Sequence, residues 1–183
     1  MTAVRAPALL AFALLCACAS SAPEEPRATA SLEGRTVRPG CRQGECSWVR
    51  VARVETQTSV PEGELRRIVA RSGRSTHRGD LPRRAADADI AWESSDSERF
   101  VFCSTQRPAF AFPGDGGLIV HFLDLFDLAG FQLSSAALYM TFCHGREALP
   151  DEAALRALGY RPGTRNEQVE ATGAEEMTRF RPS

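Results

Sequence analysis

Short runs of strand-forming residues, separated by turn-forming residues, fill most of the chain between positions 48 and 143. The run 48–58 is rich in β-branched residues, and in the run 99–105 Phe100 and Phe102 share one face. The run 109–112 repeats the alternation, and Pro-Gly-Asp-Gly-Gly at 113–117 predicts a turn into a strand at 118–122. A period of two is typical of half-buried β-strands. The pattern therefore predicts a domain built mainly from antiparallel strands.

Other segments complete this expectation. Strands are expected at 89–92, at 136–143 and at 168–171, and the polar residues 94–98 predict a hairpin between 89–92 and 99–105. The segment 65–71 fits helical spacing as well, but its β-branched pair favours a strand. Residues 123–128 could form a single turn, and 150–158 predicts a helix with Asp151 as its N-cap and Gly159 after its end. The predicted fold class is mainly β (α+β), a small antiparallel sheet with one peripheral C-terminal helix.

The chain has six cysteines, of which two lie near its start and four lie in the predicted domain. Four cysteines allow three disulfide connectivities, and we favour Cys41 with Cys46 and Cys103 with Cys143. A metal or redox site is the alternative, but the chain contains neither a CxxC motif nor paired zinc-type spacings. We therefore expect a domain held by two disulfides.

The N-terminus has the pattern of a secretory signal peptide. Arg5 precedes an uncharged apolar run at 6–15, which is shorter than the roughly 20 residues that a membrane-spanning helix needs. A buried helix of the folded protein is the alternative, but the position of the run and its flanks favour a signal peptide at 1–17. Export to an oxidising compartment agrees with an even number of domain cysteines.

The residues Leu15-Cys16-Ala17-Cys18 resemble the lipobox of bacterial lipoprotein precursors. The resemblance implies that Cys18 becomes the first mature residue and carries acyl chains that hold the protein on a membrane. Ala19 at the next position implies passage to the outer membrane, facing the periplasm. Cleavage after Ala19 by an ordinary signal peptidase is the alternative, and it would release a soluble secreted protein.

The mature chain divides into three parts by composition. Residues 18–40 contain Ser, Pro, Ala, Glu and Arg without an apolar period, which indicates a lipidated cysteine followed by a flexible tether. A single β-rich domain is expected over 41–162, and a polar tail over 163–183.

Charge gives little indication of a partner. The net charge is −1, and all 22 basic residues are arginine. Arginines are frequent between 66 and 84, and acidic residues follow them up to position 98. This stretch could bind an anionic glycan, or its charges could pair with each other across strands. Nucleic acid is not an expected partner outside the cytoplasm.

Four side chains could form a catalytic or metal site: His121, Asp124, Asp127 and His144. Imidazole and carboxylate groups bind metals and act as general bases. The alternative is a purely structural role, in a loop where Asp124 and Asp127 cap backbone groups. The signatures G-x-S-x-G, P-loop and HExxH are absent, so we expect no catalytic residue, cofactor or metal.

These observations predict a lipid-anchored envelope protein that acts as a binding or structural module for a periplasmic protein or a glycan. The design is similar to that of small disulfide-stapled lipoproteins that inhibit host lysozymes, although no inhibitor motif matches. An envelope hydrolase would instead bring His121, Asp124 or Asp127 together with His144 in one pocket. A passive factor that stabilises an outer-membrane complex would have neither a pocket nor a charged patch.

Overall fold

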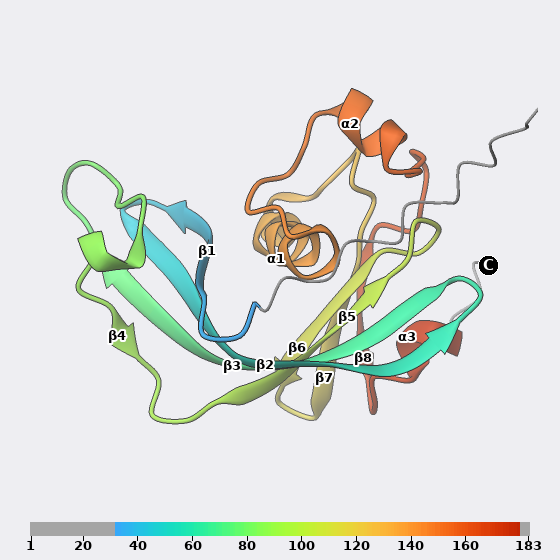
Figure 1. Cartoon of the computed structure of the whole chain (residues 1–183), viewed down its shortest axis with the longest axis horizontal. Helices are drawn as coiled ribbons and strands as arrows, with labels where there is room; N and C mark the ends of the chain where they lie inside the picture. The colour runs from blue at the N-terminus through green and yellow to red at the C-terminus, as the bar shows by residue number, and fades with distance from the viewer. Residues whose placement is uncertain (1–31, 180–183) are drawn as a thin grey trace, which may run out of the picture.

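The computed structural model describes residues 32–179, and within them an antiparallel sheet of eight strands dominates the fold (Figure 1). The strand order is β1-β2-β3-β5-β6-β7-β8, and β4 pairs with β3 beside β5. The strands are β1 (Thr36–Arg42), β2 (Glu45–Val60), β3 (Gly63–Thr76), β4 (Ala91–Trp92), β5 (Ser97–Cys103), β6 (Ala109–Gly114), β7 (Gly117–Phe122) and β8 (Glu167–Ala171). The predicted mainly antiparallel β fold with disulfides is confirmed.

Three α-helices and two 3₁₀ turns accompany the sheet in this part of the chain. They are η1 (Ala85–Asp87), η2 (Gly130–Gln132), α1 (Leu133–His144), α2 (Glu152–Ala157) and α3 (Glu176–Arg179). The helix α1 lies in the hollow of the curved sheet, whereas α2 lies above it at the edge of the molecule (Figure 1). The predicted signal peptide 1–17, the predicted lipidation site Cys18 and the start of the predicted tether lie outside the described residues.

The sheet buries side chains on both of its faces. The face toward α1, here called the front, packs Ile68, Val101 and Phe110 against Tyr139 and Phe142 of the helix. The back face packs a second apolar cluster against the segment that contains α3: Leu65, Phe102, Val120, Phe122, Ala174 and Met177. Alternation along each strand sends successive side chains to opposite faces, which explains how β3, β5 and β6 contribute to both clusters.

One segment was wrongly predicted as a strand. Residues 136–143 belong to the helix α1, although Leu138, Met140 and Phe142 alternate in the sequence. Tyr139 and Thr141, between them, are buried as well. A helix that is buried on nearly all sides lacks the amphipathic period from which helices are recognised. The apparent alternation is therefore a by-product of almost continuous burial.

The hairpin predicted between 89–92 and 99–105 is also wrong. Trp92 pairs with Gly73 and Ser97 pairs with Ala70, so β4 and β5 lie one after the other along the same partner strand, β3. The polar residues between them form a break in one edge rather than a reversal of the chain. The strand that was favoured over a helix at 65–71 is confirmed as part of β3.

The C-terminal helix and its cap agree with the sequence. The Asp151 side chain accepts a hydrogen bond from the Ala154 amide at 2.8 Å, and Gly159 follows α2 with a φ of +91°. A glycine tolerates this left-handed conformation without a steric penalty. Residues 163–179, by contrast, are more ordered than a polar tail, because β8 pairs with β7 and Met177 is fully buried. The fold also begins before position 41, since Leu32 and Val37 belong to the front core.

Both favoured disulfides are present. Cys41 and Cys46 are directly opposite each other across the β1–β2 hairpin, whereas Cys103 at the end of β5 is bonded to Cys143 in the last turn of α1. The second bond closes a sequence separation of 40 residues, against 5 for the first. It therefore constrains the unfolded chain more strongly.

We predict that the double variant Cys103→Ala/Cys143→Ala loses about 4 kcal/mol of unfolding free energy, because loop-closure entropy grows with loop length. The matched variant Cys41→Ala/Cys46→Ala should lose about 2 kcal/mol by the same argument. Urea denaturation of both variants and the parent protein measures the difference. Equal losses, or a larger loss for the hairpin bond, would contradict this ranking.

Candidate functional site

His121 is a buried residue of β7 whose two ring nitrogens both have partners. Nδ1 lies 2.8 Å from the Ser135 hydroxyl at the start of α1, and Nε2 lies 3.0 Å from Oε1 of Gln168 on β8. An amide oxygen only accepts, so Nε2 carries the proton and Ser135 donates to Nδ1. Burial lowers the pKa of His121, against the smaller effect of the Gln168 bond, so the ring is neutral at neutral pH.

Two aromatic rings complete the surroundings of His121. Phe112 and Phe131 contact the imidazole edge to face, with centroid distances of 5.1 and 5.3 Å. The Ser135 hydroxyl and the imidazole have the hydrogen bond that a nucleophile and its base share. However, both residues are buried, with only 4–5% of their surface exposed. The arrangement therefore joins the sheet to α1 and leaves a substrate no access to Ser135.

The two aspartates after β7 do not contribute to a site with His121. The Asp124 carboxylate accepts hydrogen bonds from the amides of Phe126 at 3.0 Å and Gly163 at 2.7 Å. It therefore shapes the 124–127 turn and ties it to the chain before β8. Asp127 contributes its backbone carbonyl, which accepts from the Asn166 side chain. The capping role considered for Asp124 is confirmed.

His144 lies in a different place, at the C-terminal end of α1 and beside the Cys103–Cys143 bond. Here an open cleft of about 300 Å³, called the disulfide cleft below, is lined by Gly63, Glu64, Arg66, Cys103, Ser104, Thr105, Cys143, His144 and Tyr160. Gly63 is required at its wall, because a Cβ there would collide with the Cys103 carbonyl. The structure thus separates His144 from His121, Asp124 and Asp127.

A chain of hydroxyl groups lies behind the disulfide cleft. Tyr139 donates to the Ser104 carbonyl at 2.9 Å and lies 2.8 Å from the Tyr160 hydroxyl, which lies 2.5 Å from Nε2 of His144. Tyr139 has a single proton, so every contact is satisfied when Tyr160 donates to Tyr139 and His144 donates to Tyr160. This arrangement places a proton on Nε2 of His144, which either the neutral or the charged imidazole can supply.

The electrostatics of the cleft agree with a neutral network. Burial, Arg146 and Arg66 lower the pKa of His144, and burial raises the pKa of Tyr160 to about 12. Burial also raises the pKa of Tyr139 well above its ordinary value. Arg66 is held by Glu64 at 2.6 Å and by the Phe142 carbonyl at 2.8 Å. The cleft can bind a small polar group, but its tyrosine is not activated as a base or a nucleophile.

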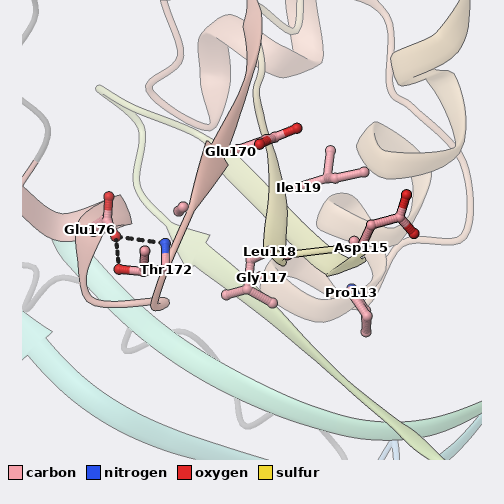
Figure 2. A pocket seen from close by; sticks show the side chains of 11 residues that line it. Pro113, Asp115, Gly117, Leu118, Ile119, Glu170, Thr172 and Glu176 are labelled. Carbon is pink, nitrogen blue, oxygen red and sulfur yellow. Dashed lines mark hydrogen bonds between the residues drawn. The ribbon is translucent and has the colours of Figure 1, made fainter.

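A second hollow, of about 380 Å³, lies around the β6–β7 turn and the end of β8 (Figure 2). Its side chains separate by face: Asp115, Ile119 and Glu170 lie on one side of the strands, and Thr172 and Glu176 on the other (Figure 2). Glu176 accepts from the Thr172 amide at 2.8 Å and from its hydroxyl at 2.7 Å. These bonds lower the pKa of Glu176 and indicate a role in fixing the chain before α3.

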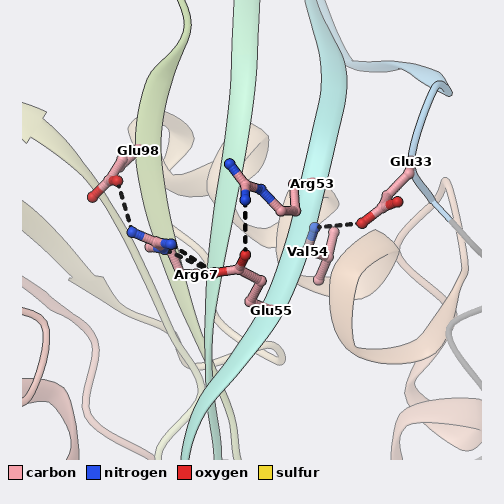
Figure 3. Close-up of polar contacts among 6 residues, drawn as sticks. All are labelled: Glu33, Arg53, Val54, Glu55, Arg67 and Glu98. Carbon is pink, nitrogen blue, oxygen red and sulfur yellow. Dashed lines mark hydrogen bonds and ion pairs between the residues drawn. The ribbon is translucent and has the colours of Figure 1, made fainter.

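The arginine-rich stretch pairs largely with neighbouring acidic residues. On the back face, Arg67 contacts Glu55 at 2.6 Å and Glu98 at 3.0 Å, while Arg53 contacts Glu55 at 3.2 Å (Figure 3). Figure 3 also shows Glu33 accepting from the Val54 amide. Further pairs join Arg66 with Glu64, Arg71 with Asp96, Arg74 with Glu45 and Arg84 with Asp87. Such pairing favours the self-neutralised interpretation over an anionic-glycan surface.

Residues 32–179 contain no group of three or more His, Cys, Asp and Glu side chains placed to hold a metal ion. The same residues include no helix that is both long and apolar enough to cross a membrane. Comparisons with protein-family models, curated proteins and solved structures found no match.

Sequence reasoning missed two parts of these sites. Tyr139 and Tyr160 were not singled out, because a tyrosine in an apolar run gives no sign of its hydroxyl partner. Phe131, which is 56% exposed, was not singled out either. The available signals were the glycine before it and the polar Gln132 after it, which are the first and last residues of a 3₁₀ turn.

We predict that acidification destabilises the fold as the pH falls below about 6.5, the ordinary pKa of histidine. Both His121 and His144 have a lowered pKa, so the unfolded chain takes up protons first and stability falls as the pH drops below the unfolded value. Each histidine contributes at most about 1.4 kcal/mol per pH unit. Denaturation at several pH values measures the slope.

The variants His121→Gln and His144→Gln serve as controls for this slope. Each variant should reduce the slope of the unfolding free energy against pH by the contribution of the histidine it lacks. This reduction should appear even if the variant changes stability at pH 8. Carboxylates with a lowered pKa, such as Glu55 and Glu176, lose their contribution only at lower pH. An unchanged slope in both variants would show that these two histidines do not cause the loss of stability.

Proposed function

We propose that this protein is a lipid-anchored bacterial envelope protein whose folded domain is a binding or structural module for another envelope protein. The observation that carries the proposal is the exposure of two large hydrophobic side chains beside α1. Phe131 is 56% exposed and Leu133 is 55% exposed, two positions apart in the sequence. Grouped apolar side chains on the surface of a soluble domain are typical of protein-binding sites.

The charges and the sites of the domain support a protein partner over the other candidates. An anionic glycan would need free guanidinium groups, whereas the 66–84 stretch pairs largely with its own acids. A hydrolase would need His121, Asp124 or Asp127 near His144, and these residues lie in separate hydrogen-bond networks. A passive stabilising factor would not require exposed phenylalanine and leucine side chains.

The lipid anchor and the outer-membrane location rest on the lipobox-like residues 15–18 and on the export pattern before them. Two disulfides within the domain agree with an oxidising compartment such as the periplasm. Acyl chains on Cys18 would keep the domain at the membrane surface, since each buried methylene contributes about 0.8 kcal/mol.

The anchor is tested by the intact mass of the processed protein from a membrane fraction, before and after reduction. We expect a chain that begins at Cys18, carries acyl groups and gains four hydrogens on reduction, since both disulfides open. Cys18→Ser should abolish the acyl mass and move the protein to the soluble fraction. A lipid-free chain beginning at Ser20 would overturn the anchor and leave a soluble secreted protein.

The binding role is tested by placing a light-activated crosslinking amino acid at position 133 in living cells. We expect a discrete protein adduct there, because Leu133 is exposed and lies only two positions from Phe131 in the chain. The matched control is position 81, because Leu81 is 46% exposed at a different part of the domain. The same adducts at both positions, or none at 133, would argue against a binding module.

A further inference from the structure

The strands β6 and β7 carry apolar side chains on the front face that are only partly covered, and β8 places an acidic side chain beside them. Phe112 of β6 is directly opposite Ile119 of β7, which is directly opposite Glu170 of β8. Cross-strand partners project to the same face of a sheet, so these three side chains form one row. Phe112 and Ile119 are only half-buried.

Phe131 extends this row toward the helix. Its ring contacts His121, the residue two positions after Ile119 on β7, and Phe112 contacts the same imidazole. His121 is itself fixed by Ser135 and Gln168, so it forms a rigid base under both phenylalanines. We call the surface formed by Phe112, Asp115, Ile119, Phe131 and Glu170 the β7 patch.

The charges of the β7 patch differ from those elsewhere on the sheet. Asp115 and Glu170 are both exposed and lie on the same side as Ile119 (Figure 2). Within residues 32–179 neither carboxylate forms an ion pair, whereas Glu55, Glu98 and Asp96 are bound by arginines. The net charge of the chain is only −1, so the negative potential here is a local property.

We propose that the β7 patch binds a protein surface that presents an apolar side chain flanked by basic groups. The apolar row would bury that side chain, and Asp115 and Glu170 would attract the basic groups and set their orientation. Two unpaired carboxylates oppose contact with an anionic lipid surface, which distinguishes this partner from the membrane. The inference rests on the proposed function, because it names the kind of partner that the module takes.

The experiment uses purified, ¹⁵N-labelled mature protein and a short peptide of alternating arginine and phenylalanine as the probe. Amide shift changes should cluster at Phe112, Ile119, Phe131 and Glu170. The variant Asp115→Lys/Glu170→Lys should bind the probe about tenfold more weakly, since it reverses the charges nearest to the apolar row. Raising the salt concentration should weaken binding to the parent protein.

The matched control is Asp80→Lys/Asp89→Lys, which changes the net charge equally at two exposed aspartates outside the patch. It should leave the affinity within about twofold of the parent value, because distant exposed charges are screened. An equal loss in this control would mean attraction by total charge alone and would overturn the proposal. The proposal would also be overturned if a glutamate–phenylalanine peptide bound the patch as tightly as the arginine–phenylalanine peptide does.

Two further results would assign the β7 patch to another occupant and overturn the proposal. One is binding to vesicles that contain phosphatidylglycerol, lost in Phe131→Ser. The other is concentration-dependent self-association of the protein, lost in the same variant. Either result would still leave the proposed function in place if position 133 crosslinks to a protein in cells. If position 133 gives no protein adduct, the proposed function and this inference are both overturned.

Discussion

The seating of α1 against the front of the sheet is the contact on which the rest of the structure depends. The helix contributes Tyr139 and Phe142 to the main core, and the Cys103–Cys143 bond fixes its last turn to β5. Its first turn reaches His121 through Ser135. Both surface sites lie at an end of this helix: the β7 patch at its start and the disulfide cleft at its end. A displacement of α1 would therefore alter the two sites together.

The sequence predicted the sheet well because strand alternation is a local property. Most of the strands, the Asp151 cap and both disulfides could be recognised from residues within a few positions or from simple counting. The helix α1 could not, because its burial is imposed by the sheet around it and hides its period. The pairing of β4 with β3 rather than β5 was missed for a related reason, since the partner strand is distant in the sequence.

The candidate sites were harder to predict than the fold. His121 and His144 were recognised as chemically interesting, but their partners Ser135, Gln168 and Tyr160 come from other elements. In the structure, each histidine has a lowered pKa and lies in a hydrogen-bond network, so it is a neutral side chain rather than a general base. The surface around them differs in character, because charges on the back of the sheet neutralise each other and those of the β7 patch do not.

The cross-strand bond between Cys41 and Cys46 has a mechanical consequence. Tension applied through the chain before Leu32 pulls on the start of β1, and a hairpin under such tension opens one residue pair at a time. Peeling would run from the Thr36–Arg50 pair toward the turn and stop at the Cys41–Cys46 pair. From that point the force passes through a covalent bond into β2, which is paired with β3 along its whole length. The disulfide thus limits how far β1 can be pulled away from the sheet before β2 carries the load.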